Sequence, residues 1–98
     1  MDALHDMWRE EYAEVDKTLE KITEALMNGD KERAYRAVME LLEWWGRKRS
    51  VTLDLSGDVR EVLTKVARGE HPISEERILP GTTFKELVDK LLKLIETG

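Results

Sequence analysis

The chain has 98 residues, of which 41% are hydrophobic and 38% are charged, and its formal net charge is −5 at pH 7. This length suits one domain, residues 1–98, with a single core and no elaborate active-site cleft. The sequence contains no cysteine, which excludes disulfide bonds, thiolate metal sites and cysteine nucleophiles.

Residues 3–27 carry an apolar stripe with the period of one long helix. The stripe residues recur at steps of three or four and fall within about 80° of one another on a helical wheel. They are Leu4, Trp8, Tyr12, Val15, Leu19, Ile22 and Leu26. A stripe this long and narrow requires other helices to pack along it. Glu11 falls inside the same stripe, so we expect its carboxylate to be desolvated.

A short turn at Asn28, Gly29 and Asp30 predicts a second helix over residues 31–48. Glycine closes a helix in the left-handed conformation, and an aspartate that follows can cap the next helix. So short a turn predicts an antiparallel helical hairpin. The face of the second helix that we expect to be buried contains Ala34, Val38, Leu41, Leu42 and Trp45.

Residues 50–57 change from the helical period to an alternation of two residues. Val51, Leu53 and Leu55 alternate here with polar residues. No partner strand is apparent, so we expect an extended connector whose apolar side chains cover the end of the helices. A short edge strand that pairs with a second copy of the chain is the alternative.

Two capping boxes predict the remaining helices. Asp58 with Glu61 opens a short third helix, and Thr83 with Glu86 opens the last one. Residues 74–79, which lie between them, are expected to make one helical turn. The apolar face predicted for the last helix contains Phe84, Leu87, Val88, Leu91, Leu94 and Ile95. These elements predict an all-α fold, an antiparallel four-helix bundle in which a long N-terminal hairpin is covered by two shorter helices.

The sequence offers little for catalysis. His5 and His71 lack the spacing of metal ligands, and no glycine-rich phosphate loop or activated nucleophile is apparent. We therefore predict no enzyme activity, no cofactor and no metal. Glu11 leaves one weaker enzymatic alternative, a general acid within the stripe. The competing interpretation is a carboxylate paired with an arginine of the second helix.

Trp44 and Trp45, followed by Arg47, Lys48 and Arg49, form the sharpest local feature. Neighbouring helical residues diverge by about 100°, so we expect Trp45 in the core and Trp44 outside it. An aromatic ring beside three cations could stack a nucleobase while the cations hold phosphates. We favour the other interpretation, in which Trp44 packs beneath the connector and the cations complement the helix dipole, because the whole chain is acidic.

Met7 and Leu92 also fall outside the apolar stripes of their helices. If they converge with Trp44, they would form a contact patch for another protein chain, and methionine and tryptophan are residue types that protein interfaces favour. We therefore predict a non-catalytic protein-interaction module that presents a helical face to a protein partner or to a second copy. An engineered binder or a redesigned scaffold fits the same features. Nucleic-acid binding through Trp44 and residues 47–49 is the alternative.

No apolar run approaches 18 residues and the first residues are acidic, so we expect a cytoplasmic protein that does not enter membranes.

Overall fold

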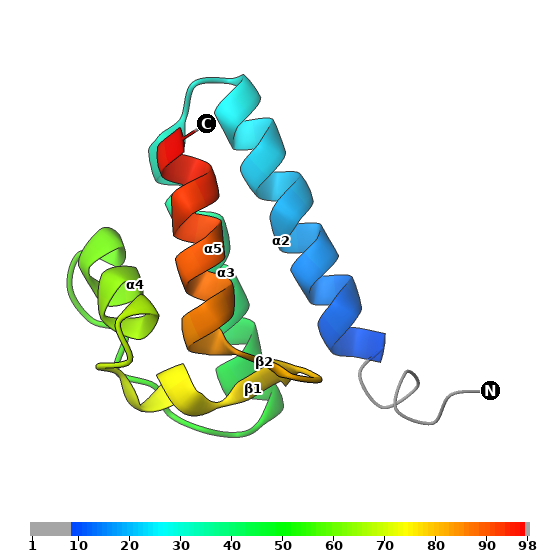
Figure 1. Cartoon of the computed structure of the whole chain (residues 1–98), viewed down its shortest axis with the longest axis vertical. Helices are drawn as coiled ribbons and strands as arrows, with labels where there is room; N and C mark the ends of the chain where they lie inside the picture. Colours follow the sequence, from blue (N-terminus) through cyan, green and yellow to red (C-terminus); the bar gives the residue numbers. More distant parts are fainter. Residues whose placement is uncertain (1–8, 98) are drawn as a thin grey trace.

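The computed structural model describes residues 9–97, most of which are helical, and so confirms the all-α class (Figure 1). The elements in chain order are α2 (Arg9–Met27), α3 (Lys31–Lys48), α4 (Val59–Ala67), the 3₁₀ helix η1 (Pro72–Glu75), β1 (Arg77–Leu79), β2 (Thr82–Thr83) and α5 (Phe84–Thr97). The first predicted helix is present from Arg9 onward. Its predicted start at residues 3–8 lies outside the described residues.

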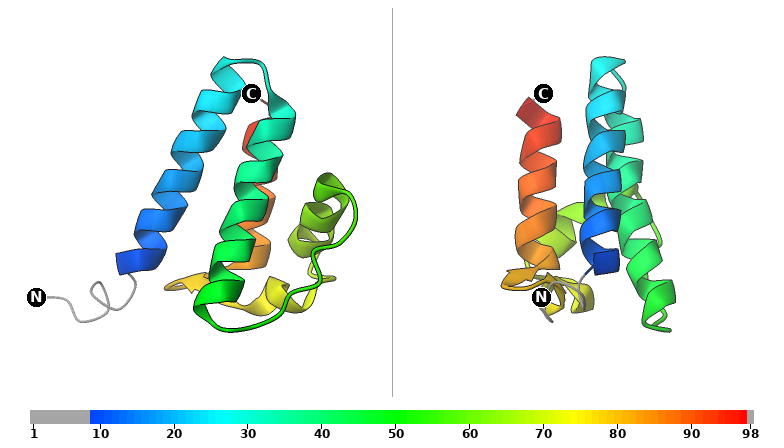
Figure 2. Two further views of the ribbon diagram at one scale, coloured as in Figure 1. Left: turned by 180° about the vertical axis from the view of Figure 1, so that it is seen from behind. Right: turned by 90° about the vertical axis from the view of Figure 1, so that its right-hand side faces the viewer.

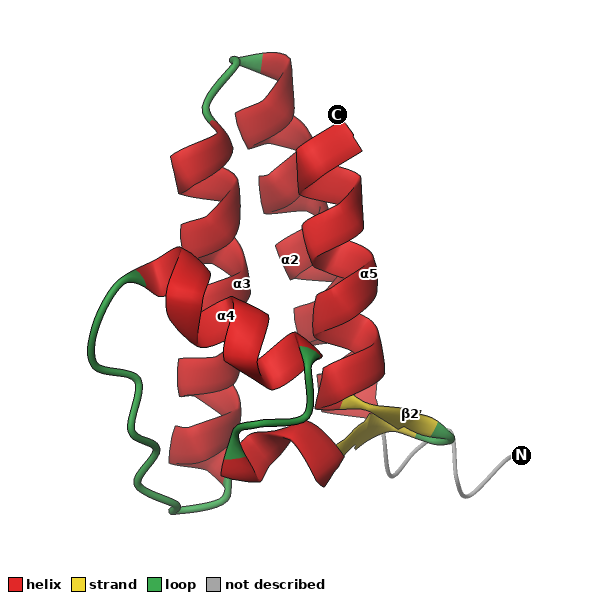
Figure 3. Cartoon of the chain, turned by 60° about the vertical axis from the view of Figure 1, so that its left-hand side comes forward, coloured by secondary structure: helices red, strands yellow, loops and turns green. Residues whose placement is uncertain are grey.

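Within residues 9–97, helix α3 contacts each of the other α-helices, α2, α4 and α5. Helices α2 and α3 form the predicted antiparallel hairpin, and they diverge away from their turn (Figure 2). Helix α5 runs alongside α3, whereas the short α4 crosses both obliquely (Figure 3). The predicted four-helix bundle is therefore not confirmed.

Local capping explains where the helices begin. Gly29 adopts a φ of 68°, and the Asp30 carboxylate accepts a hydrogen bond of 3.1 Å from the Arg33 N–H. The Glu61 N–H donates to the Asp58 carboxylate at 3.4 Å, and α5 begins after an equivalent contact to the Thr83 hydroxyl. These contacts satisfy amides that have no partner within the first turn of a helix.

The buried face of α2 is rotated by about 60° from the predicted stripe. It consists of Glu11, Val15, Thr18, Ile22 and Ala25. Tyr12 is 39% exposed, and Leu19 and Leu26 are only half-buried. The small side chains of Thr18 and Ala25 allow α2 to approach α3 closely, so the larger apolar residues lie beside that contact.

The apolar face of α5 also differs from the prediction. Leu92 is buried in the core, whereas Leu94 is 42% exposed. The cause is α4, which packs against α5 and covers the side on which Leu92 lies. The expectation that Leu92 falls outside the buried face, and that Leu94 falls within it, was wrong.

Residues 50–57 form the predicted extended connector, which makes no strand within the described chain. Leu53 and Leu55 pack against the core, whereas Val51 remains exposed. The helical turn expected over residues 74–79 was wrong. Helix η1 ends at Glu75, and a small hairpin follows in which Arg77 pairs with Thr83 and Leu79 with Thr82.

The connector passes close to α3 at Gly46. The Val51 N–H donates to the Gly46 carbonyl at 2.9 Å, and a Cβ on Gly46 would lie 3.1 Å from Leu53 Cδ1 and 3.2 Å from the Val51 oxygen. Alanine normally stabilises a helix by about 1 kcal/mol relative to glycine. We expect Gly46→Ala to destabilise instead, by about 1–2 kcal/mol, because the side chain overpacks this contact.

Denaturant unfolding of Gly46→Ala measures this effect. The matched control introduces Gly46→Ala into a Leu53→Ala background, where one of the two close contacts is gone and the loss should be smaller. A gain in stability for the single variant would show that the connector yields without cost.

Candidate functional site

Trp44 and Trp45 separate as predicted. Trp45 is 5% exposed and meets Phe84 edge to face, with ring centroids 5.4 Å apart. Trp44 is half-buried and lines a cleft of about 190 Å³ between α2 and α3. The connector runs against Gly46, which lies about 160° around α3 from Trp44. The expectation that Trp44 packs beneath the connector was therefore wrong.

The desolvation predicted for Glu11 is confirmed, because this residue is only 3% exposed. The Lys48 ammonium donates to Glu11 and also lies 3.0 Å from a Glu10 carboxylate oxygen. The partner on α3 is thus a lysine and not the expected arginine. Burial lowers the pKa of Lys48, but hydrogen bonds to Glu11 and Glu10 outweigh it and hold this pKa above its ordinary value.

The basic triplet does not form one patch. Lys48 lies 5.2 Å from the centroid of the Trp44 ring, but its charge is shared with two carboxylates of α2. Arg47 lines the cleft beside Trp44, whereas Arg49 lines a different cavity together with Glu75 and Glu76. The structure brings only Trp44, Arg47 and Lys48 together, and a phosphate would compete with Glu10 and Glu11 for Lys48.

The structure does not place the other two predicted contact residues, Met7 and Leu92, on a described exposed surface. Met7 lies outside the described residues. Leu92 is 7% exposed and belongs to the core, so the expectation of a surface position was wrong. Of the predicted patch, Trp44 alone is both described and partly accessible.

A different set of apolar side chains lies on the surface of α2 and α5. Met27 is 83% exposed, and Tyr12 and Leu94 are each more than a third exposed. Leu19 and Leu26 lie beside them and are half-buried. We call this surface the α2–α5 face and define it by Tyr12, Leu19, Leu26, Met27 and Leu94.

The contacts of each helix place Leu19 and Leu94 on the same side of the molecule. On α2, the side turned to α3 carries Lys21, which pairs with Glu40 at 2.8 Å, and Leu19 lies about 160° away from it. On α5, the side turned to α4 carries Glu96, within 4.0 Å of Arg60, and Leu94 lies about 160° away from it. Because α2 and α4 lie on opposite sides of α5, Leu94 is on the α2 side (Figure 1).

Sequence reasoning missed this face because it assumed that the whole stripe of the first helix is buried. The signal was nevertheless present. Tyr12, Leu19 and Leu26 recur at steps of seven, and they mark one edge of the stripe. Which edge stays exposed depends on where the neighbouring helix lies, and the stripe does not encode that position.

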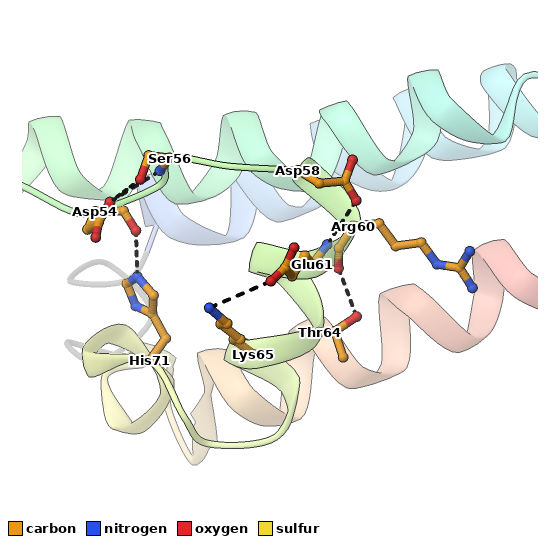
Figure 4. Close-up of polar contacts among 8 residues, drawn as sticks. All are labelled: Asp54, Ser56, Asp58, Arg60, Glu61, Thr64, Lys65 and His71. Atoms are coloured by element: carbon orange, nitrogen blue, oxygen red, sulfur yellow. Dashed lines mark hydrogen bonds and ion pairs between the residues drawn. The ribbon is translucent and has the colours of Figure 1, made fainter.

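A polar cluster ties the connector to the loop between α4 and η1 (Figure 4). His71 Nδ1 accepts a hydrogen bond of 3.2 Å from the Ile73 N–H, so its proton lies on Nε2, which donates to the Asp54 carbonyl at 3.0 Å. The Asp54 carboxylate accepts hydrogen bonds from the Ser56 hydroxyl and N–H, which lower the pKa of Asp54. Each of these groups has a structural partner, and the cluster therefore fixes the path of the chain.

Within residues 9–97, no three histidine or acidic side chains are grouped so that they could hold a metal ion. None of the described helices combines the length and the apolar character that crossing a membrane requires. No protein-family model matches the chain, and neither a curated protein nor a solved structure matches it at a significant level.

The two tryptophans should contribute unequally to stability. We expect Trp45→Ala to lower the free energy of unfolding by about 3–5 kcal/mol, because it empties a core site beside Phe84. Trp44→Ala should cost less than about 2 kcal/mol, because that ring is half-buried. Denaturant melts of both variants decide the point, and equal losses would place Trp44 in the core.

The ion pair between Lys48 and Glu11 should respond asymmetrically to truncation. We expect Lys48→Met to cost about 3 kcal/mol, because it leaves a buried carboxylate without its base. Glu11→Met should cost less than about 1 kcal/mol, since Lys48 keeps Glu10 and is 28% exposed. The double variant closes the mutant cycle, and equal single losses would contradict this assignment.

The raised pKa of Lys48 also fixes the sign of its pH dependence. Its stabilising contribution is complete below the pKa of an unfolded lysine and disappears as the pH rises through the folded value. The wild type should therefore lose more stability above about pH 10 than the Lys48→Met variant does. Unfolding measured across this pH range provides the test, and parallel curves would contradict it.

Proposed function

We propose that this chain is a non-catalytic protein-interaction module whose contact surface is the α2–α5 face. The observation that supports the proposal is the gathering of large exposed apolar side chains on one face. Met27, Tyr12 and Leu94 account for three of the four large hydrophobic residues that are exposed within the described chain. Single exposed apolar residues are ordinary, but a shared face is typical of an interaction surface.

The chemistry of the face suits a protein partner. Methionine and tyrosine are enriched at protein interfaces, because they bury a large area with adaptable or amphipathic side chains. Leu19 and Leu26 extend the apolar surface inward from the exposed residues. A partner would thus meet an apolar centre that continues into the core, which is the arrangement in which buried contacts contribute most to affinity.

The geometry of the two helices favours a helical partner. Helices α2 and α5 lie beside each other, with α3 behind them (Figures 1 and 2). Helices of a partner that pack against both would complete a four-helix arrangement with α2 and α5. We propose that a bundle is formed in this way, with the remaining long helices supplied by the partner.

Site-specific photocrosslinking tests the proposal directly. We would replace Leu94 with benzoylphenylalanine and irradiate cells that express the chain. The matched control carries the same group in place of Arg36, an exposed residue of α3. We expect an adduct of discrete mass from position 94 and none from position 36. Absence of an adduct at position 94, or equal labelling at both positions, would contradict an interface on the α2–α5 face.

A further inference from the structure

We infer that the partner on the α2–α5 face is a second copy of this chain, bound with its helices parallel to those of the first. This inference rests on the proposed function and adds the identity of the partner. Its basis is the order of charges along the two outer edges of the face. The residues of these edges are Arg9, Asp16 and Glu20 on α2, and Glu86, Lys90 and Lys93 on α5.

The helical wheel places these charges beside the apolar side chains. Asp16 and Glu20 lie about 60–100° beyond Leu19, on the side away from α3. Lys90 and Lys93 lie about 40° and 100° from Leu94, on the solvent side of α5 opposite its buried residues. All four charged residues are exposed. They therefore form the rim of the face, where charged groups select partners and fix the alignment.

At each height along the two helices, the rim residue of α2 and the rim residue of α5 carry opposite charges. Helices α2 and α5 run in the same direction and begin level with each other (Figure 1). With a rise of about 1.5 Å per residue, the three pairs of positions differ in height by at most about 3 Å. From the start of each helix, α2 reads basic, acidic, acidic, whereas α5 reads acidic, basic, basic. The pairs are Arg9 with Glu86, Asp16 with Lys90, and Glu20 with Lys93.

A two-fold axis parallel to the helices brings these rows together. Rotation about it places α2 of one copy against α5 of the other at the same height, so each of the three pairs forms twice. An axis perpendicular to the helices would instead set α2 against α2 in the antiparallel direction. In that direction Arg9 meets Glu20 of the partner subunit and Glu86 meets Lys93 of the partner subunit, but Asp16 and Lys90 gain no opposite charge from these rows. The parallel arrangement pairs all six residues, so the charges favour it.

The rim charges contrast with those on the side of α2 that faces α3. There Lys21 pairs with Glu40, and Lys48 pairs with Glu10 and Glu11. Arg9, Asp16, Glu20, Glu86 and Lys90 make no ion pair within residues 9–97. Lys93 meets Asp89 of its own helix at 3.1 Å, an exposed contact that a second partner can share. These rim residues are therefore available to pair with a second copy.

Paired charge reversals test the inference. One variant carries Asp16→Lys and Glu20→Lys, and the other carries Lys90→Glu and Lys93→Glu. In a homodimer, each variant sets like charges against each other in both copies of the contact. In a mixture, the lysines of one variant meet the glutamates of the other along one contact, and the unchanged residues restore the second.

Sedimentation equilibrium over a wide concentration range provides the readout. We expect the wild type to form a dimer that dissociates on dilution and weakens with added salt. Each reversal variant alone should associate at least about tenfold more weakly, and the equimolar mixture should recover a heterodimer. The matched control reverses the exposed pair on α3, with Glu32→Lys and Arg36→Glu, and should dimerise as the wild type does. Denaturant midpoints verify that every variant is folded.

The outcomes separate this inference from the function on which it rests. A wild type that stays monomeric throughout overturns the inference, while an adduct from position 94 to a different protein still supports the interaction module. Reversal variants that dimerise like the wild type, or a mixture that does not associate, also overturn it. The parallel pairing of α2 with α5 is supported only if each variant associates weakly by itself and the equimolar mixture forms a heterodimer.

Discussion

The structure depends on the position of α3 among its neighbours. This helix packs against α2, α4 and α5 together, and no single neighbour covers all of its buried residues. They include Ala34, Ala37, Val38, Leu41, Leu42 and Trp45. Each neighbouring helix therefore packs against α3 with the side whose side chains allow the closest packing, and that side is not always its most apolar one. For α2 the fitting side includes the small residues Thr18 and Ala25. The larger apolar residues of α2 are left along the edge of this contact, and that edge becomes the interaction surface proposed for this chain.

The contact between α2 and α3 also contains a buried charge. Glu11 is buried, and Lys48 reaches it from the last turn of α3. Such pairs contribute little net stability, because desolvation offsets most of the attraction between the charges. They do penalise the wrong alignment, in which either charge would be buried alone. The main effect of the pair is therefore to fix how α2 and α3 are aligned along their length. It lies at the end where the two helices diverge (Figure 2).

Local signals in the sequence were sufficient for the end of α2 and for the positions of α3, α4 and α5. Asp30, Asp58 and Thr83 each cap a helix as their spacing predicts, and Trp45 enters the core as the wheel predicts. The hairpin of β1 and β2 was missed because strands of three and two residues are too short to show a period. The exposure of Leu94 and the burial of Leu92 depend on where α4 crosses, which is a tertiary effect. The candidate site was missed for the same reason, since an apolar stripe does not record which of its edges a neighbour will cover.

The connector over residues 50–57 joins two parts of the chain, each of which is made of elements that are consecutive in sequence. Helices α2 and α3 form one helical hairpin before it, and α4, η1, the strands and α5 follow it. It is held by its hydrogen bonds with His71 and Gly46 and by the apolar contacts of Leu53 and Leu55, and most of its other residues are exposed. The contacts of α3 with α4 and α5 do not require this covalent link. The connector is accordingly a natural point for dividing the molecule into two fragments that reassemble on mixing, with α3 as the shared template.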